Sequence, residues 1–263
     1  MAQDTPYIDL IAWLREGEQH VPDNPDLLPL VKARCTPEEA TLLTGMPFAN
    51  TPLADLAAQK GTDVEILREK LDALAHKGVV FRAGEGDTAR YRLTDVMFTY
   101  LRSAFWPGYD NDTSRAMARH ANRFVYPFMA QWDAVAHRPI RTVPVNASVV
   151  DSRSVMPYEN VTELVNSRSF WAVAHCSCKH RKNLDPNEPD CPHPVEVCLH
   201  FDTLARYLVE NDIARPIERD EALAILEQAA GSGLVHAVSP WRDGVATICN
   251  CCKCCCAWLD TYH

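Results

Sequence analysis

The chain has 263 residues, of which 47% are hydrophobic and 23% charged, which is normal for a globular protein long enough for two modest domains. Its net charge of −9 argues against broad binding to nucleic acids or to anionic membranes. No stretch approaches the ~20 apolar residues of a membrane span and the first residues carry no export signal, so we expect a cytoplasmic protein without direct membrane insertion.

The first part, residues 1–139, is predicted to be a helical domain that contains a winged-helix-like unit. Apolar residues at helical spacing between positions 8 and 14 indicate an early helix. The next elements are predicted as two helices and then two strands: 51–61, 62–78, 79–82 and 90–93. Helix, turn, helix and hairpin is the element order of a winged helix.

The charges of this unit do not favour DNA as its partner. Helix 62–78 would be the reading helix, and a helix that contacts phosphates is expected to be clearly basic. Its charged residues are instead mixed: Asp63, Glu65, Glu69 and Asp72 against Arg68, Lys70 and Lys77. We therefore favour protein contacts or a homodimer for this unit. A long amphipathic helix over 114–137 is predicted to lie in a core or an interface.

The second part, residues 140–263, is predicted to be a small ferredoxin-like iron–sulfur domain, which makes the whole chain an α+β protein. The predicted order is an extended segment, a helix, a strand, two helices and two strands: 140–150, 158–167, 170–174, 194–210, 219–230, 234–238 and 245–248. Cysteines follow two of these strands, so a sandwich of helices and strands could bring them to one edge.

Ten of the eleven cysteines lie in this second part, and six of them fall within residues 249–256. Cys249, Cys252 and Cys255 form a C-x-x-C-x-x-C ladder, Cys251 and Cys254 form an interleaved pair, and a further cysteine at position 256 closes the run. A ladder of this kind with a distant fourth cysteine holds the cluster in bacterial ferredoxins. Soft thiolate ligands at such density indicate iron–sulfur clusters or zinc.

An upstream set supplies four more thiols: Cys176, Cys178, Cys191 and Cys198. These four would suffice for one four-coordinate centre, and the ten cysteines together could serve two four-iron clusters. We expect one or two 4Fe-4S clusters per chain and leave the assignment of ligands to each cluster open. The predicted ligands are Cys176, Cys178, Cys191, Cys198, Cys249, Cys251, Cys252, Cys254 and Cys255.

Zinc and disulfides are the alternatives. Four histidines lie among the upstream cysteines, but structural zinc sites more often use two well-separated knuckles than a crowded run. Disulfides need an oxidising compartment. We therefore favour iron–sulfur ligation, with His175 and His200 as packed residues or hydrogen-bond donors and Cys35 as a small buried hydrophobe.

The basic cluster Lys179-His180-Arg181-Lys182 has two interpretations. A run of charges is most often a solvated face. Alternatively, these cations stabilise a reduced cluster or attract an acidic partner. The sequence also contains no glycine-rich phosphate loop, nucleophile elbow or H-E-x-x-H motif, so it offers no sign of substrate chemistry of its own.

The cysteine motifs carry a resemblance to a known family. The matching stretches are 174–180, 191–199, 221–226, 233–236 and 248–256. They resemble bacterial and archaeal 4Fe-4S-binding, ferredoxin-like proteins with a winged-helix-like N-terminal region. The resemblance implies electron transfer. Such proteins often continue into a further ferredoxin module, whereas this sequence stops at residue 263, which favours a component that hands electrons to a partner.

Three functions follow as hypotheses. The favoured one is a 4Fe-4S protein that transfers electrons to or from a partner flavoprotein or metalloenzyme, as a component of an oxidoreductase system and not a stand-alone enzyme. The second is a winged-helix transcriptional regulator whose cluster senses redox state or oxygen. The third is an accessory subunit of an enzyme whose catalytic centre lies on another chain.

Overall fold

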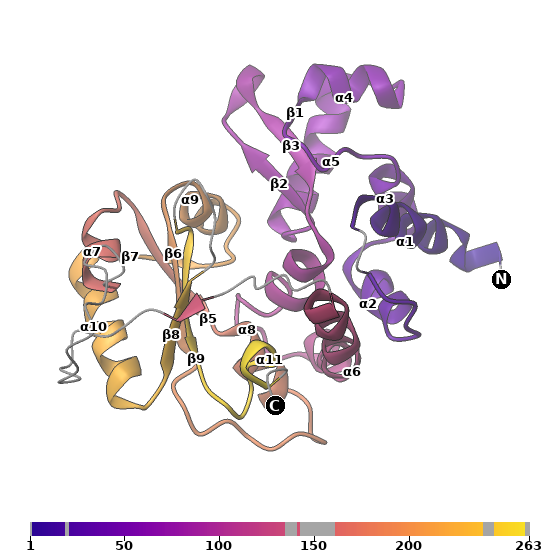
Figure 1. Cartoon of the computed structure of the whole chain (residues 1–263). Helices are drawn as coiled ribbons and strands as arrows, with labels where there is room; N and C mark the ends of the chain where they lie inside the picture. Colours follow the sequence, from indigo (N-terminus) through magenta and orange to yellow (C-terminus); the bar gives the residue numbers. More distant parts are fainter. Residues whose placement is uncertain (1, 19–20, 135–140, 143–160, 239–244, 261–263) are drawn as a thin grey trace.

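Helices dominate the first half of the computed structural model, which describes residues 2–18, 21–134, 141–142, 161–238 and 245–260 (Figure 1). The helices are η1 (Ala2–Asp4), α1 (Thr5–Gly17), α2 (Leu27–Arg34), α3 (Pro37–Leu43), α4 (Leu53–Lys60), α5 (Val64–His76), η2 (Gly86–Thr88), η3 (Met97–Arg102) and α6 (Asp112–Ala134). The strands β1 (Thr51–Pro52), β2 (Val80–Ala83) and β3 (Arg90–Leu93) form a small antiparallel sheet in the order β1-β3-β2.

Local sequence signals explain the boundaries of these elements. A capping box formed by Thr36 and Glu39 starts α3, and the Asp63 carboxylate accepts from two backbone N–H groups at the start of α5. Gly61 ends α4 in the left-handed conformation, with a φ of 61°. The predicted order of two helices and a hairpin is confirmed, with β1 added beside β3. That the unit is a winged helix stays a prediction.

A second, larger sheet organises the other half of the chain. Its strands are all antiparallel to their neighbours and follow the order β4-β8-β9-β6-β5-β7. They span Arg141–Thr142 (β4), Trp171–His175 (β5), Glu196–Phe201 (β6), Arg215–Ile217 (β7), Val235–Val238 (β8) and Thr247–Cys251 (β9). The helices are α7 (Val161–Asn166), α8 (Ser177–Asn183), α9 (Asp202–Glu210), α10 (Arg219–Gly231) and α11 (Ala257–Asp260).

The prediction of one helix over 194–210 is wrong. Residues 196–201 form the strand β6, and α9 begins only at Asp202, which has a positive φ of 52°. Val197 and Phe201 favour a strand, and β6 pairs with β5 on one side and β9 on the other, so tertiary pairing decides its conformation. Cys198 therefore lies in a central strand instead of at a helix start.

The mixed helix and sheet class is confirmed, while the likeness to a ferredoxin stays a prediction. The division between domains at residues 139 and 140 lies outside the described residues. Several predicted segments also fall partly outside them: the extended segment 140–150, the start of helix 158–167 and the end of helix 114–137.

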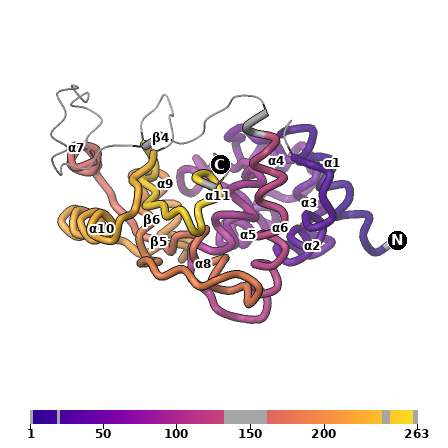
Figure 2. The backbone as a smooth tube through the Cα atoms, turned by 60° about the horizontal axis from the view of Figure 1, so that its bottom comes forward, coloured from indigo at the N-terminus to yellow at the C-terminus, as the bar shows by residue number. Residues whose placement is uncertain are grey.

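The two halves share buried surface. One hydrophobic cluster extends from Tyr7 in α1 to Trp258 in α11, and another joins Phe81 of β2 to Tyr207 of α9. In both views of the backbone, α8 and α11 lie between the large sheet and α6 (Figures 1 and 2). The junction between the halves is therefore packed by side chains from both.

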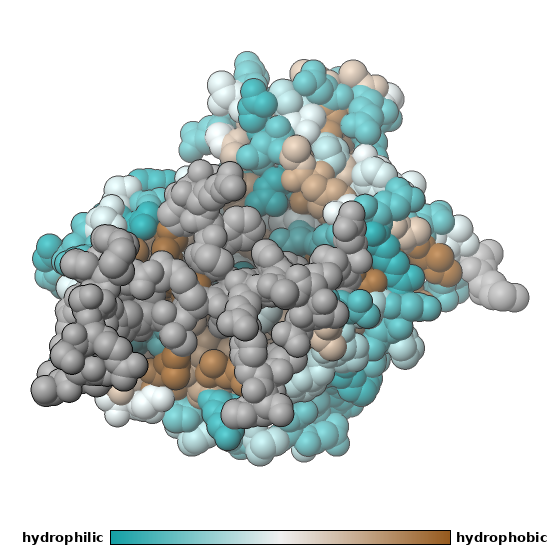
Figure 3. All heavy atoms as spheres, in the orientation of Figure 1, coloured by the Kyte–Doolittle hydropathy of each residue, from teal (hydrophilic) through white to brown (hydrophobic). Residues whose placement is uncertain are grey.

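Helix α6 is amphipathic, as predicted. Phe124, Val125 and Phe128 are buried on its inner face, and Arg123 is exposed on the other. Among the described helices, none combines the length and the apolar character that crossing a membrane would require. The face seen in Figure 3 is mainly hydrophilic over the unit formed by α4, α5 and the β2–β3 hairpin.

Candidate metal centres

The structure divides the ten cysteines of the second half into two groups. The six-thiol group surrounds a cavity between the large sheet and the helices of the first half: Cys176, Cys178, Cys198, Cys249, Cys251 and Cys256. The four-thiol group lies beside it and has one exposed member: Cys191, Cys252, Cys254 and Cys255. Cys252 also borders this cavity, but its sulfur hydrogen-bonds with Cys191, Cys254 and Cys255, so we count it with the second group. Every cysteine of the predicted ligand set belongs to one group or the other.

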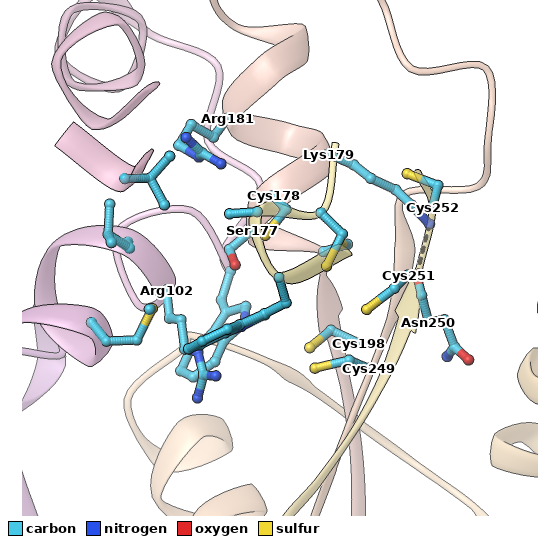
Figure 4. A pocket seen from close by; sticks show the side chains of 18 of the residues that line it. Arg102, Ser177, Cys178, Lys179, Arg181, Cys198, Cys249, Asn250, Cys251 and Cys252 are labelled. Atoms are coloured by element: carbon cyan, nitrogen blue, oxygen red, sulfur yellow. Dashed lines mark hydrogen bonds between the residues drawn. The ribbon is translucent and has the colours of Figure 1, made fainter. Parts of the chain in front are cut away.

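The strand pairing explains why distant cysteines meet in the six-thiol group. Leu199 of β6 pairs with Ile248 of β9, so the residues that flank this pair, Cys198 and Cys249, also lie opposite each other. Cys251 comes two residues after Cys249 and therefore points to the same face of β9. In Figure 4 these three sulfurs point to the same side, into the pocket.

The remaining three thiols come from helix starts at the edge of the sheet. Cys176 immediately precedes α8, Cys178 lies in its first turn, and Cys256 immediately precedes α11. Thiol hydrogen bonds join Cys176, Cys178, Cys256, Cys251, Cys249 and Cys198 in that order. Cys198 and Cys176, at the two ends, also interact electrostatically, and we call the six sulfurs the ring.

The ring borders a cavity of about 40 Å³. A site needs only ~10–15 Å³ on this measure to hold one water molecule, so the cavity has room for a larger group. Its other walls are mainly apolar and come from the first half of the chain: Met97, Leu101, Trp106, Val125 and Met129. The segment Met97–Arg102 is a π-helix, a rare conformation that is frequent at functional sites.

The four-thiol group is more compact. The Cys191 sulfur lies 3.7 Å from the Cys252 sulfur and 3.7 Å from that of Cys254, and the sulfurs of Cys254 and Cys255 are 3.6 Å apart. All four sulfurs lie within 4.8 Å of one another, which is close enough to hold a metal ion. Cys191 is positioned by its backbone N–H, which donates to the Asn183 side chain at 2.8 Å.

This division differs from both spacing patterns. The ladder Cys249, Cys252 and Cys255 is split between the two groups, because β9 ends after Cys251 and the following turn brings Cys252 and Cys255 to the other group. The upstream set is split as well: Cys191 joins the four-thiol group, whereas the other three face the cavity. Cys256 was absent from the predicted ligands and completes the ring.

The basic cluster on α8 is not a solvated face. All four of its residues are buried, with Lys179 0% and Arg181 1% exposed. Lys179 donates to the carbonyl oxygens of Pro194 and Asn250, and Arg181 to that of Ala121. The second terminal nitrogen of Arg181 is buried without a partner among the described residues. The interpretation as a solvated face is therefore wrong.

Three cations line the cavity: Lys179 and Arg181 from α8 and Arg102 from η3 (Figure 4). Among the described residues, none of the three forms an ion pair with a carboxylate. Leaving a cation buried and unpaired costs several kcal/mol. The groups that can offset their charge within the cavity are the cysteine sulfurs, once they are deprotonated.

The electrostatics of the ring favour thiolates at two positions. The Cys176 and Cys256 thiols hydrogen-bond to Cys178 and, with the Arg181 charge, hold the pKa of Cys178 well below its ordinary value. The thiols of Cys198 and Cys251, with Arg102, do the same for the pKa of Cys249. The thiolate is the form of cysteine that binds metals.

The histidines near these groups behave as packed residues. Burial lowers the pKa of His200 to about 3, so its ring is neutral at neutral pH. Its Nδ1 lies 3.1 Å from the Thr247 hydroxyl and its ring packs edge-on against Trp106. The backbone N–H of His175 donates to the Trp106 carbonyl at 3.1 Å. Cys35 is buried among apolar residues, as predicted. It is far in sequence from the cysteines of both thiol groups.

Sequence reasoning missed the contribution of the first half of the chain. Arg102, Trp106 and Met129 line the cavity, but no local pattern marks them as site residues. The one available signal was Arg102 itself, a charged residue within an otherwise apolar segment at 96–106. Comparison with protein-family models, with curated proteins and with solved structures found no match.

Proposed function

We propose that the protein is an electron-transfer component whose six-thiol group binds a 4Fe-4S cluster and exchanges electrons with a partner flavoprotein or metalloenzyme. The observation that carries the proposal is the combination of six thiols and three cations around one cavity, with Lys179 and Arg181 buried and Arg102 partly buried. An ordinary protein core rarely contains either feature, because burying unpaired charges or free thiolates lowers the stability of the fold.

Charge supports a cluster held by thiolates. A four-iron cluster with four thiolate ligands is anionic, and it becomes more so on reduction. Arg102, Lys179 and Arg181 would offset that charge, because none of the three is paired with a carboxylate among the described residues. Four of the six thiols would bind iron, and the other two remain able to donate hydrogen bonds to sulfur, an interaction that tunes the reduction potential.

The surroundings also suit electron transfer. Leu101, Val125 and Met129 keep water from one side of the cavity, and the sheet closes the other. A dry, rigid surrounding limits how far the protein and solvent must rearrange when the cluster gains or loses an electron. It also strengthens the electrostatic effect of each nearby charge. When bound, the cluster supplies a centre that takes up and releases one electron. The residues of this chain hold it, shield it and set its potential.

The proposal is tested by iron and acid-labile sulfide analysis of protein purified without oxygen, with electron paramagnetic resonance after dithionite reduction. We expect about four irons and four sulfides per chain and a reduced-cluster signal. Cys249→Ser should lower both contents at least severalfold, whereas Cys35→Ser should leave them unchanged. Protein that contains zinc but no sulfide would contradict the proposal.

A redox-sensing regulator is the second candidate. One observation favours it: Arg82 of β2 pairs with Glu210 of α9, which joins the hairpin to the large sheet. The same contact counts against DNA binding, since Arg82 is already engaged, and Arg68 is paired with Glu65 and Asp87. DNA binding that depends on salt and appears in only one cluster state would favour the regulator over the electron carrier.

A further inference from the structure

The two thiol groups differ in how closely their sulfurs approach. Among the described residues, the four-thiol group is the one set of three or more potential metal ligands whose ligand atoms all lie within 4.8 Å of one another. Three of its sulfur–sulfur distances are 3.6, 3.7 and 3.7 Å. The six-thiol group is spread around a cavity instead.

This spacing fits a single ion. A tetrahedral ion with metal–sulfur bonds of about 2.3 Å places its four sulfurs roughly 3.8 Å apart. A four-iron cluster inserts four metal atoms and their sulfides between the cysteine sulfurs and so spreads them beyond the 4.8 Å limit of this group. We propose that Cys191, Cys252, Cys254 and Cys255 bind one structural zinc ion, separate from the cluster.

The local backbone supports a closed metal site. Cys252 and Cys255 are separated by two residues in a turn, the C-x-x-C spacing of a zinc knuckle. The Cys256 N–H donates to the Cys252 carbonyl at 3.1 Å. Cys191 arrives on the loop between α8 and β6, held by Asn183 at the end of α8. The ion therefore ties that loop to the end of β9, across 61 residues of chain.

Charge is balanced on one side of the site. Zinc with four thiolates has a net charge of −2. The ammonium group of Lys179 donates to the carbonyl of Asn250 at 3.1 Å, and Asn250 lies two residues before Cys252. Figure 4 shows Asn250 and Cys252 beside the Lys179 side chain. Lys253 lies within the turn itself and is exposed.

Zinc is favoured over a single iron for two reasons. A given ligand set binds Zn²⁺ more tightly than Fe²⁺. Cys254 is also exposed, and zinc has no redox chemistry, so an ion at the surface remains stable when oxygen reaches it. The role that follows is structural: the ion closes the edge of the sheet next to the six-thiol cavity.

Metal analysis of paired variants tests this inference independently of electron transfer. Wild-type protein purified without oxygen should contain about one zinc per chain in addition to its iron. Cys254→Ala should lower the zinc content at least tenfold and leave iron and sulfide unchanged. The matched variant Cys249→Ala, at a position where the ring favours a thiolate, should do the reverse. About eight irons per chain with no zinc, or loss of iron in Cys254→Ala, would overturn the inference.

A spectroscopic measurement guards against a variant that misfolds. Wild-type protein whose zinc has been exchanged for Co²⁺ should show the visible bands of cobalt in a tetrahedral site together with thiolate-to-metal charge transfer. A weak octahedral cobalt spectrum, or exchange of cobalt into Cys254→Ala with an unchanged spectrum, would contradict a four-thiolate site at these residues.

Discussion

At the scale of single residues, the buried cations determine what the cavity can hold. One terminal nitrogen of Arg181 is hydrogen-bonded and the other has no partner within the described part of the chain, and the charge of Arg181 already favours the thiolate of Cys178. A side chain that is costly to bury and incompletely hydrogen-bonded is retained more readily where an anion offsets it. We expect the charge of Arg181 to affect the reduction potential of the cluster that we propose for the ring.

Replacing this cation should lower the reduction potential. Arg181→Met removes a positive charge that stabilises the reduced, more negative state, so we expect a shift to more negative potential by tens of millivolts, the order expected for one charge at an effective dielectric constant near 20. Redox titration of the visible or paramagnetic signal measures it. The exposed Arg206, replaced by Met, is the control; an unchanged or raised potential for Arg181→Met contradicts this role.

Cys35 is expected to be unreactive in the folded protein. Burial raises the pKa of its thiol to about 12, it is 5% exposed, and its sulfur lies 3.2 Å from the Val31 carbonyl oxygen. Alkylation by iodoacetamide needs the thiolate. Mass spectrometry after labelling at pH 8 should find Cys35 unmodified until urea unfolds the chain. Labelling at the rate of a free thiol would show that α2 opens readily.

At the scale of elements, an ion-pair cluster joins α2 to α6. Asp26, at the start of α2, lies 2.7 Å from a terminal nitrogen of Arg123 and 2.7 Å from Nδ1 of His120, both on α6. Burial alone would raise the pKa of Asp26, but hydrogen bonds from Arg123 and His120 outweigh it, so the folded pKa lies below 3.8. The carboxylate therefore stabilises the fold when it is charged.

Removing this carboxylate should matter at neutral pH and cease to matter in acid. Because the folded pKa is lowered, the stabilisation is complete well above pH 3.8 and is lost as the pH falls through the folded value. Asp26→Asn should cost about 1 kcal/mol in urea unfolding at pH 7 and less at pH 3. Asp23→Asn, at an exposed pair with Arg15, is the control. A cost for Asp26→Asn that does not change with pH would count against the charge as its cause.

The elements themselves were largely predictable, while the grouping of cysteines was not. Helix caps and alternating patterns gave α5, β2, β3, α10 and β8 because those signals are local. Two kinds of information were missing. The conformation of β6 depends on its neighbours in the sheet, and a strand that ends at Cys251 sends successive cysteines to different sites. The spacing of cysteines in the sequence does not say in which direction the chain turns after a strand.

The residues that line the cavity from the first half of the chain could not be predicted for a related reason. Met129 and Arg102 face the cysteines only because α6 and η3 pack against α8 and α11. Apolar residues of this kind look the same in sequence whether they border a cofactor or an ordinary core. What the composition did indicate correctly was that distant cysteines would gather closely enough to hold a metal ion, and that Cys35 would be a small buried residue.

At the scale of the whole molecule, the two halves are joined through buried polar contacts as well as apolar ones. The Tyr207 hydroxyl on α9 lies 3.0 Å from the Ala75 carbonyl and 2.8 Å from that of Val80, both in the first half. The ring of Tyr207 also packs against Phe81, with 4.4 Å between ring centroids. We therefore expect the halves to unfold together.

Removing the single hydroxyl group of Tyr207 tests whether the two halves unfold together. Tyr207→Phe removes the buried hydroxyl that the Ala75 and Val80 carbonyl oxygens share as a donor, and it should cost about 1 kcal/mol. Urea unfolding followed both by circular dichroism and by the absorbance of bound iron should shift to the same lower midpoint. Tyr109→Phe, at an exposed ring, is the control. Separate midpoints for the two signals would show that the halves unfold independently.

The division of neighbouring cysteines between two sites has a consequence for how the protein is made. Cys251 and Cys252, like Cys255 and Cys256, are adjacent in the chain but belong to different groups. Neither group can be completed until this run has left the ribosome, whereas η3 and α6 emerge much earlier and can fold first. In the proposals above, the cluster and the zinc ion would therefore be inserted only after η3 and α6, which form one wall of the cavity, have been synthesised.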